Sequence, residues 1–266
     1  MPERYTLGHH ESVLRSHRWR TAENSAAYLL PHLRPGMNLL DVGSGPGTIT
    51  VDLARTVFPG RVVGIDASEE VVAEATRLAA EQGVENVEFR VADAYDPGFA
   101  DGSFDVVHAH QVLQHLGRPV EALAAWRALV LPDGLVAARD CDYAGAIVAP
   151  TRPGLELWSI TYQQLARTNH GTPDAGRHLK AWAHEAGFSV VDAGASVWCF
   201  QSDADRDWWG GLWADRTLES EFASGVVERG LGDTATLAAI REGWLAWRDD
   251  RDGWMILPHG EILARG

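Results

Sequence analysis

The sequence contains only one lysine, Lys180, and its 23 basic residues are outnumbered by 37 aspartates and glutamates. The formal net charge is −14, and no run of lysines and arginines interrupts it. A chain of this charge is repelled by nucleic-acid backbones and by anionic membrane surfaces. We therefore expect neither a nucleic acid nor a membrane as its main partner.

Cysteine and long apolar runs are also scarce. The two cysteines, Cys141 and Cys199, lie far apart in apolar surroundings, which fits neither a disulfide framework nor a zinc site. The first residues contain no apolar stretch typical of a secretory signal. No segment approaches the roughly 20 apolar residues that span a bilayer. Together these absences predict a soluble, cytoplasmic protein.

Strand-like and helix-like segments alternate along the first half of the chain, which favours a parallel, doubly wound α/β sheet. With 266 residues, one elaborated domain is favoured over two. The predicted strands are 37–42, 61–66, 86–91, 104–109, 135–141, 189–200 and 254–263. The predicted helices are 47–57, 69–82, 118–130 and 175–187.

A glycine-rich turn follows the first predicted strand. Gly43, Gly45 and Gly47 alternate with other residues just before a helix, an arrangement that brings bare backbone against a cofactor. A dinucleotide fingerprint would need its third glycine at Thr48, so a nicotinamide cofactor is disfavoured. With Asp41 two residues before Gly43, the pattern resembles motif I of the class I S-adenosylmethionine (SAM) methyltransferases.

The resemblance extends over about residues 36–142, because later strands end in the expected motifs. It is closest to the branch that includes ubiquinone and menaquinone biosynthesis methyltransferases and many natural-product methyltransferases. One departure is residues 131–134, Leu-Pro-Asp-Gly, where relatives usually have Lys-Pro-Gly-Gly. The resemblance implies a Rossmann-like seven-stranded sheet of order 3-2-1-4-5-7-6, with strand 7 antiparallel and helices on both faces.

The resemblance also implies a set of cofactor-binding residues. Asp41 would organise the turn near the methionine amino group, Asp66 would accept hydrogen bonds from the ribose hydroxyls, and Arg20 suits the SAM carboxylate. The alternatives are a helix cap for Asp66 and a surface helix around Arg20. The full set is Arg20, Asp41, Gly43, Gly45, Gly47, Asp66, Ala67, Asp93, Ala94 and His110.

Four residues are candidates for catalysis because they follow strands whose ends face the acceptor in relatives. His115 and His110 follow the fourth strand, and a histidine near its ordinary pKa is a good general base. Asp140 and Tyr143 end the fifth strand. The alternatives are a packed histidine, and a polar loop in which Asp140 pairs with Arg139. Because no third ligand accompanies His108 and His110, no metal is predicted.

Three segments are additional to the core of this fold. Residues 1–35 are expected to form a helical cap, and inserts 144–172 and 202–252 within the domain 36–266 are expected to cover the substrate. Tryptophans are concentrated in and just after the second insert, where they form either a core or an aromatic pocket.

These patterns predict methyl transfer from SAM to O, N or C of a small apolar or aromatic metabolite. Two alternatives remain: a cyclase, isomerase or decarboxylase that binds SAM, or a non-catalytic SAM-binding module. A homodimer is compatible with the sequence.

Overall fold

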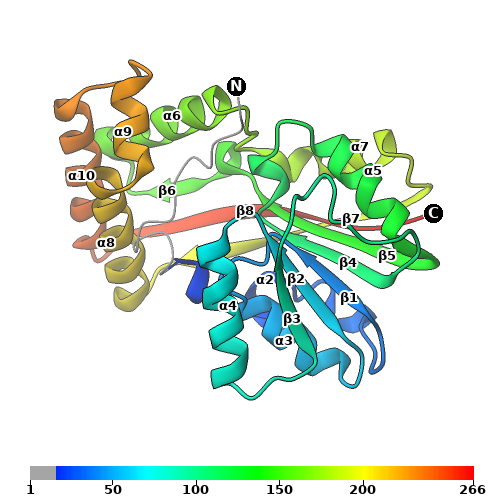
Figure 1. Ribbon diagram of the computed structural model, residues 1–266. Helices are drawn as coiled ribbons and strands as arrows, with labels where there is room; N and C mark the ends of the chain where they lie inside the picture. The colour runs from blue at the N-terminus through cyan, green and yellow to red at the C-terminus, as the bar shows by residue number, and fades with distance from the viewer. Residues whose placement is uncertain (1–15) are drawn as a thin grey trace.

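The computed structural model describes residues 16–266, and in it a twisted eight-stranded sheet carries helices on both faces (Figure 1). The strands are β1 (Leu39–Val42), β2 (Val62–Asp66), β3 (Val87–Val91), β4 (Phe104–His110), β5 (Val130–Cys141), β6 (Ile147–Ala149), β7 (Val190–Phe200) and β8 (Trp254–Arg265). The helices are α2 (Ala22–Ser25), α3 (Thr48–Val57), α4 (Glu69–Glu81), α5 (Pro119–Leu129), α6 (Pro153–Thr168), α7 (Leu179–Glu185), α8 (Asp203–Glu219), α9 (Glu221–Glu228) and α10 (Thr234–Arg248).

Apart from the additional strand β6, the strands have the predicted order and directions. Strands β3, β2, β1, β4 and β5 are parallel neighbours in that order, and β8 lies antiparallel between β5 and β7. With β7 and β8 as the predicted sixth and seventh strands, the order 3-2-1-4-5-7-6 is confirmed. Because the parallel strands all end at one edge, the loops that follow them meet there.

One strand was not predicted. Residues 259–264 of β8 pair with β5, but its first residues, 254–256, extend beyond β5 and pair with β6 from the insert 144–172. The predicted number of seven strands is therefore one too few, because it omits β6. It supplies backbone partners to the part of β8 that would otherwise have an open edge on that side.

Two element boundaries also differ from those predicted. Strand β5 begins at Val130, five residues earlier than expected, and its pairing with β4 is irregular between Phe104 and Val106. The helix predicted over 175–187 opens as a 3-10 turn at Ala175–His178 before α7.

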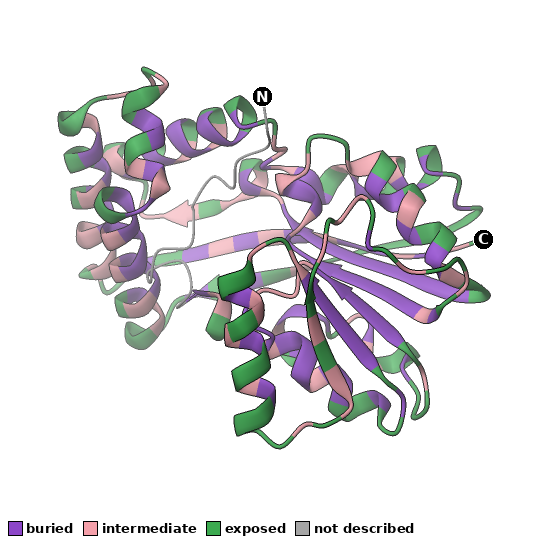
Figure 2. Ribbon diagram, viewed as in Figure 1, coloured by how far each residue is buried: buried purple, intermediate pink, exposed green. Residues whose placement is uncertain are grey.

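Successive side chains along each strand point to opposite faces of the sheet, so the hydrophobic core has one part on each face. Leu39 packs with α2 and α3 on one face, whereas Leu40 packs with α5 and α7 on the other, as expected for side chains that alternate along a strand. Figure 2 shows the central strands as almost continuously buried. The sheet is thus covered on both faces, and its carboxyl edge is left for ligands.

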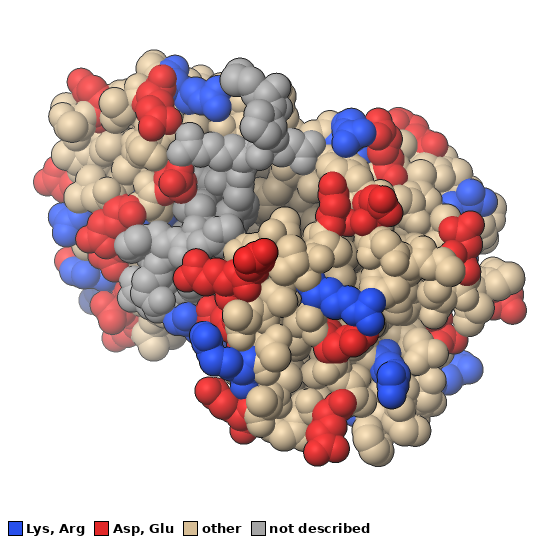
Figure 3. Space-filling model, in the orientation of Figure 1, with Lys and Arg blue, Asp and Glu red and all other residues tan. Residues whose placement is uncertain are grey.

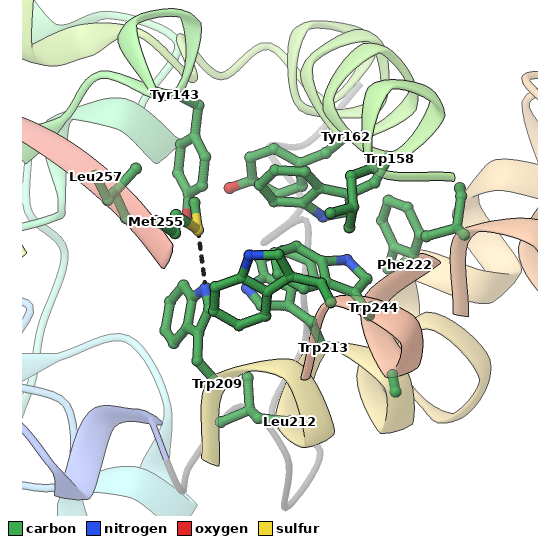
Figure 4. Close-up of a cluster of buried hydrophobic side chains, with 14 of the residues drawn as sticks. Tyr143, Trp158, Tyr162, Trp209, Leu212, Trp213, Phe222, Trp244, Met255 and Leu257 are labelled. Atoms are coloured by element: carbon green, nitrogen blue, oxygen red, sulfur yellow. Dashed lines mark hydrogen bonds between the residues drawn. The ribbon is translucent and has the colours of Figure 1, made fainter. Parts of the chain in front are cut away.

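A third core lies outside these two faces. Helices α6, α8, α9 and α10, all from the two inserts, gather around the N-terminal part of β8 (Figure 1). Figure 4 shows their aromatic side chains pointing toward one another. Trp158, Trp213 and Trp244 are fully buried there, and the ring centroids of Trp158 and Trp213 are 4.9 Å apart. The core interpretation of the insert tryptophans is therefore confirmed for most of them.

Candidate active site

A cavity of about 420 Å³ lies at the carboxyl ends of β1, β2 and β4. Its volume is typical of a site for a small molecule or cofactor. Its walls include every predicted cofactor-binding residue except Gly47. The predicted set therefore surrounds one space in the folded chain.

The glycine turn between β1 and α3 forms one wall of this cavity. Gly43 has a φ of +66°, and a Cβ atom there would lie 2.4 Å from Cγ2 of Val112, so this position excludes any side chain. At Gly45 the φ is +55° and the surroundings are open, which leaves room for a ligand against the backbone. Gly47 instead packs against Phe89 of β3 and does not line the cavity, which differs from its predicted role.

Asp41 is buried at the end of β1 and is held on both sides. One carboxylate oxygen accepts a hydrogen bond from the Thr50 hydroxyl at 2.5 Å, and the other lies 2.7 Å from Nδ1 of His108. Thr50 belongs to the first turn of α3, and His108 to β4. Asp41 therefore ties together the strand, helix and neighbouring strand that shape the turn.

The Asp66 carboxylate links the second strand to the glycine turn. It accepts hydrogen bonds from the backbone N–H groups of Gly45, at 3.1 Å, and Ser68, at 3.0 Å. Each oxygen retains acceptor capacity for a further donor. Ala67 beside it is exposed and lines the cavity.

The loop after β3 forms the opposite wall. The carboxylate of Asp93 accepts from the N–H of Tyr95 at 2.9 Å, and the carbonyl of Ala94 accepts from the Trp126 indole at 2.8 Å. Both interactions fix the backbone of this loop beside the cavity.

Asp140, a predicted catalytic residue, lines neither this cavity nor the second one described below. Its buried carboxylate accepts the backbone N–H groups of Leu113 and Gln114, each at 3.2 Å. Burial raises the pKa of Asp140 to about 7. Arg139 pairs with Glu261 at 3.1 Å, and not with Asp140 as the alternative interpretation required. Asp140 thus supports the turn that carries His115.

The two candidate histidines both line the cavity. His110 is buried, and neither of its ring nitrogens has a hydrogen-bond partner among residues 16–266. Burial, and then the positive charge of Arg20, lowers the pKa of His110 well below its usual value and that of His115 to about 3. Nε2 of His115 lies 3.1 Å from Nε2 of Gln114. Both imidazoles are therefore neutral near pH 7.

A second, smaller cavity of about 20 Å³ adjoins the first. His17, Arg20, Gln111 and His115 line both spaces. Most of the other walls of the second cavity are aromatic, namely Trp19, Tyr143, Tyr162, Trp198 and Trp209. Of these, sequence reasoning had singled out Tyr143 as catalytic and the insert tryptophans as a group.

Three residues around the second cavity, Trp198, Tyr162 and Arg216, were not predicted as site residues. The only sequence signal for Tyr162 and Arg216 was that they lie in inserts expected to cover the substrate. Trp198 lies in the predicted strand 189–200, which gave no such signal. Gln111 carried a similarly weak signal, because it follows the fourth strand, whose end faces the acceptor in relatives.

The remaining surface offers little sign of other ligand classes. Within residues 16–266, no three His, Cys, Asp or Glu side chains are grouped to hold a metal ion. In the same part of the chain, no helix combines the length and apolar character needed to cross a bilayer. On the face shown in Figure 3, acidic and basic side chains are interspersed without an extended basic area.

Acidification from about pH 7.5 to 5 is expected to lower the free energy of unfolding. The pKa values of His110, His115 and His259 are lowered in the folded chain, mainly by burial, whereas that of Asp140 is raised. Below about pH 6.5 the unfolded chain therefore binds protons at three histidines that the folded chain leaves neutral, and this exceeds the opposite effect of one aspartate. Urea denaturation across this range measures the change, and a constant free energy would contradict it.

Comparison with known proteins agrees with the geometry. A family model described as "Methyltransferase domain" matches residues 33–199. An uncharacterized methyltransferase of Schizosaccharomyces pombe is 33% identical over 98% of this chain and 96% of its own length. A ubiquinone biosynthesis O-methyltransferase of a Caulobacter species is 39% identical, but over only 38% of this chain and 39% of its own.

Among solved structures, the YcgJ protein of Bacillus subtilis superposes with a TM-score of 0.61 at 19% identity, covering 91% of this chain and 98% of that one. This likeness supports the fold. The family match and the full-length relative go further, since they extend across the cavity-lining strand ends. The chain therefore belongs to the class I SAM-dependent methyltransferases.

Proposed function

We propose that this methyltransferase transfers the methyl group of SAM to an O, N or C atom of a small apolar or aromatic metabolite that binds where the first cavity meets the aromatic side chains around the second, which at about 20 Å³ is itself large enough only for water. The observation that carries this proposal is that an aromatic-walled space adjoins the cofactor cavity and shares His115 and Arg20 with it. An acceptor held there would stand beside the methyl group. Positioning of this kind supplies a large part of the acceleration in displacement reactions.

We assign the cofactor contacts to the residues around the first cavity. Asp66 would accept from the ribose hydroxyls, and Asp93 and the backbone of Ala94 would contact the adenine, with Ala67 packed against it. Arg20 would bind the carboxylate of the methionine part, which lies over the glycine turn. When bound, SAM supplies an electrophilic methyl group on a sulfonium.

The proposed role of His115 follows from its low pKa. With a pKa of about 3, the imidazole at the junction of the cavities stays neutral at physiological pH, and its Nε2 faces the amide nitrogen of Gln114. It is too weak a base to remove a proton from an ordinary alcohol. The proposal therefore favours acceptors whose nucleophilic atom is already acidic or carries a lone pair. His110 and Tyr143 would orient the same molecule.

We also propose that residues 1–35 and the inserts 144–172 and 202–252 exclude water from the acceptor. Residues 1–15 lie outside the described part of the chain. The support comes from the second cavity, whose walls include Trp19, Tyr162 of α6 and Trp209 of α8. Excluding water strengthens electrostatic control and prevents misdirected attack on the sulfonium.

Incubation with methyl-labelled SAM and a metabolite extract of the host tests the proposed reaction. We expect one small aromatic or apolar compound to gain label, with S-adenosylhomocysteine formed in equal amount. A chelator is expected to leave the rate unchanged. Turnover of a metabolite without consumption of SAM would instead favour a cyclase, isomerase or decarboxylase reaction.

A further inference from the structure

We infer that Gln111 is a positioning residue that holds the Arg20 guanidinium at the cofactor cavity through a hydrogen-bonded chain anchored on β8. The inference rests on the proposed role of Arg20 toward the SAM carboxylate. Gln111 follows β4 and is buried. Its side chain lies between Arg20 and His259.

The chain of hydrogen bonds has a fixed direction. Arg20 donates through Nη2 to Oε1 of Gln111 at 2.7 Å. Because a guanidinium can only donate, the amide oxygen must face it. The amide nitrogen then faces Nε2 of His259 on β8 and Sγ of Cys141 on β5, each 2.9 Å away. Nδ1 of His259 lies 3.1 Å from the carbonyl of Leu257, which only accepts. His259 therefore carries its proton on Nδ1 and accepts from Gln111 at Nε2.

The backbone of Gln111 is strained in a way that points to its side chain. Its φ of +56° is one of two positive values at non-glycine positions in the described residues. Such a conformation is unfavourable for a residue with a Cβ atom, whereas glycine would adopt it freely. The turn also directs the next residue, Val112, against Gly43. Glycine could make that turn, but only a glutamine side chain links Arg20 to His259.

The Arg20 guanidinium also packs against the ring of Trp198. Its guanidinium carbon lies 5.6 Å from the Trp198 ring centroid, and the indole N–H is fixed by a 2.8 Å hydrogen bond to the carbonyl of Asn24. The ring of His259 packs against the same tryptophan at 4.4 Å. Gln111 thus adds a directional hydrogen bond to the contact between the guanidinium and the Trp198 ring. A guanidinium held in advance loses less conformational freedom when it binds a carboxylate.

Two substitutions separate the side chain of Gln111 from its backbone. Gln111→Leu and Gln111→Gly both remove the amide, but only glycine relieves the φ strain. We expect both variants to bind S-adenosylhomocysteine about three- to tenfold more weakly in calorimetry, with different melting temperatures. In steady state, KM for SAM should rise by a similar factor. Unchanged affinity in both variants would overturn the inference.

A double-mutant cycle with Arg20→Ala tests whether Gln111 acts through Arg20. If it does, Gln111→Leu should have no further effect on affinity in the Arg20→Ala background. Additive losses would overturn the inference, because they would mean that Gln111 acts by another route.

Two further results separate this inference from the proposed function. If Arg20→Ala alone leaves the affinity unchanged, the proposed carboxylate contact fails. His259→Phe, at a residue that lines neither cavity, should weaken binding in the same direction as Gln111→Leu. A wild-type affinity in His259→Phe would remove the anchor from the inference and overturn it.

Discussion

Replacing Trp213 with alanine is expected to lower the free energy of unfolding by about 3–5 kcal/mol. The indole is fully buried, and its ring lies 4.9 Å from that of Trp158 and 5.8 Å from that of Trp244. Few side chains of the third core make so many aromatic contacts (Figure 4). The surrounding rings belong to four helices, α6, α8, α9 and α10, so the cavity would not collapse easily. Urea denaturation followed by circular dichroism measures the loss.

Trp254→Ala is the matched control for this experiment. Trp254 is 38% exposed at the start of β8, so its removal leaves a much smaller void, with a loss of about 1 kcal/mol or less. Equal losses in the two variants would contradict the assignment of Trp213 to a tightly packed core. Trp213→Ala is also expected to weaken acceptor binding, because α8 supplies Trp209 and Arg216 to the second cavity.

Replacing Asp66 with alanine is expected to weaken SAM binding by about 1.5–3 kcal/mol, the usual range for hydrogen bonds to a charged group. That range corresponds to roughly ten- to 150-fold in Kd. The substitution removes the proposed ribose acceptor. It also releases the N–H groups of Gly45 and Ser68, so the glycine turn loses one of its restraints. Calorimetric titration with S-adenosylhomocysteine measures the change.

Asp101→Ala controls for the loss of one negative charge. Asp101 is exposed between β3 and β4 and does not line the cavity, so its variant should bind with wild-type affinity. A folded Asp66→Ala variant that also keeps wild-type affinity would refute the ribose assignment.

The cofactor side of the site was predictable because its determinants are local. Each motif joins a strand end to the following turn within a few residues, as from Asp41 to Gly47. The parallel order of the strands then brings the separate ends to one edge. All the residues predicted to bind the cofactor, with the exception of Gly47, line the first cavity. That glycine is required by Phe89, which lies on a strand more than 40 residues away, and no local pattern reports such a contact.

The second cavity, beside which we place the acceptor, was less predictable because its walls come from distant segments. Trp19, Tyr162 and Trp198 meet only when the N-terminal segment, an insert helix and an edge strand pack together. The prediction for Asp140 failed because of the direction of its side chain, which is set by the alternation of side chains along β5. Its side chain points beneath the turn at Leu113 and not toward the acceptor, and the sequence does not reveal which face of a fully buried strand a residue occupies. Strand β6 was missed because three residues are too short to show a period of two.

The ends of the second insert lie next to each other in the sheet. Phe200, just before α8, is paired across the ladder with Met255, just after α10. In topological terms, helices α8–α10 form one long excursion between the two strands of a β-hairpin. The paired strands β7 and β8 belong to the sheet, while the cofactor-binding motifs lie on other strands. The family could thus exchange this excursion for another and acquire a new acceptor while keeping the same SAM site, which makes the insert the natural place to redirect this enzyme by grafting.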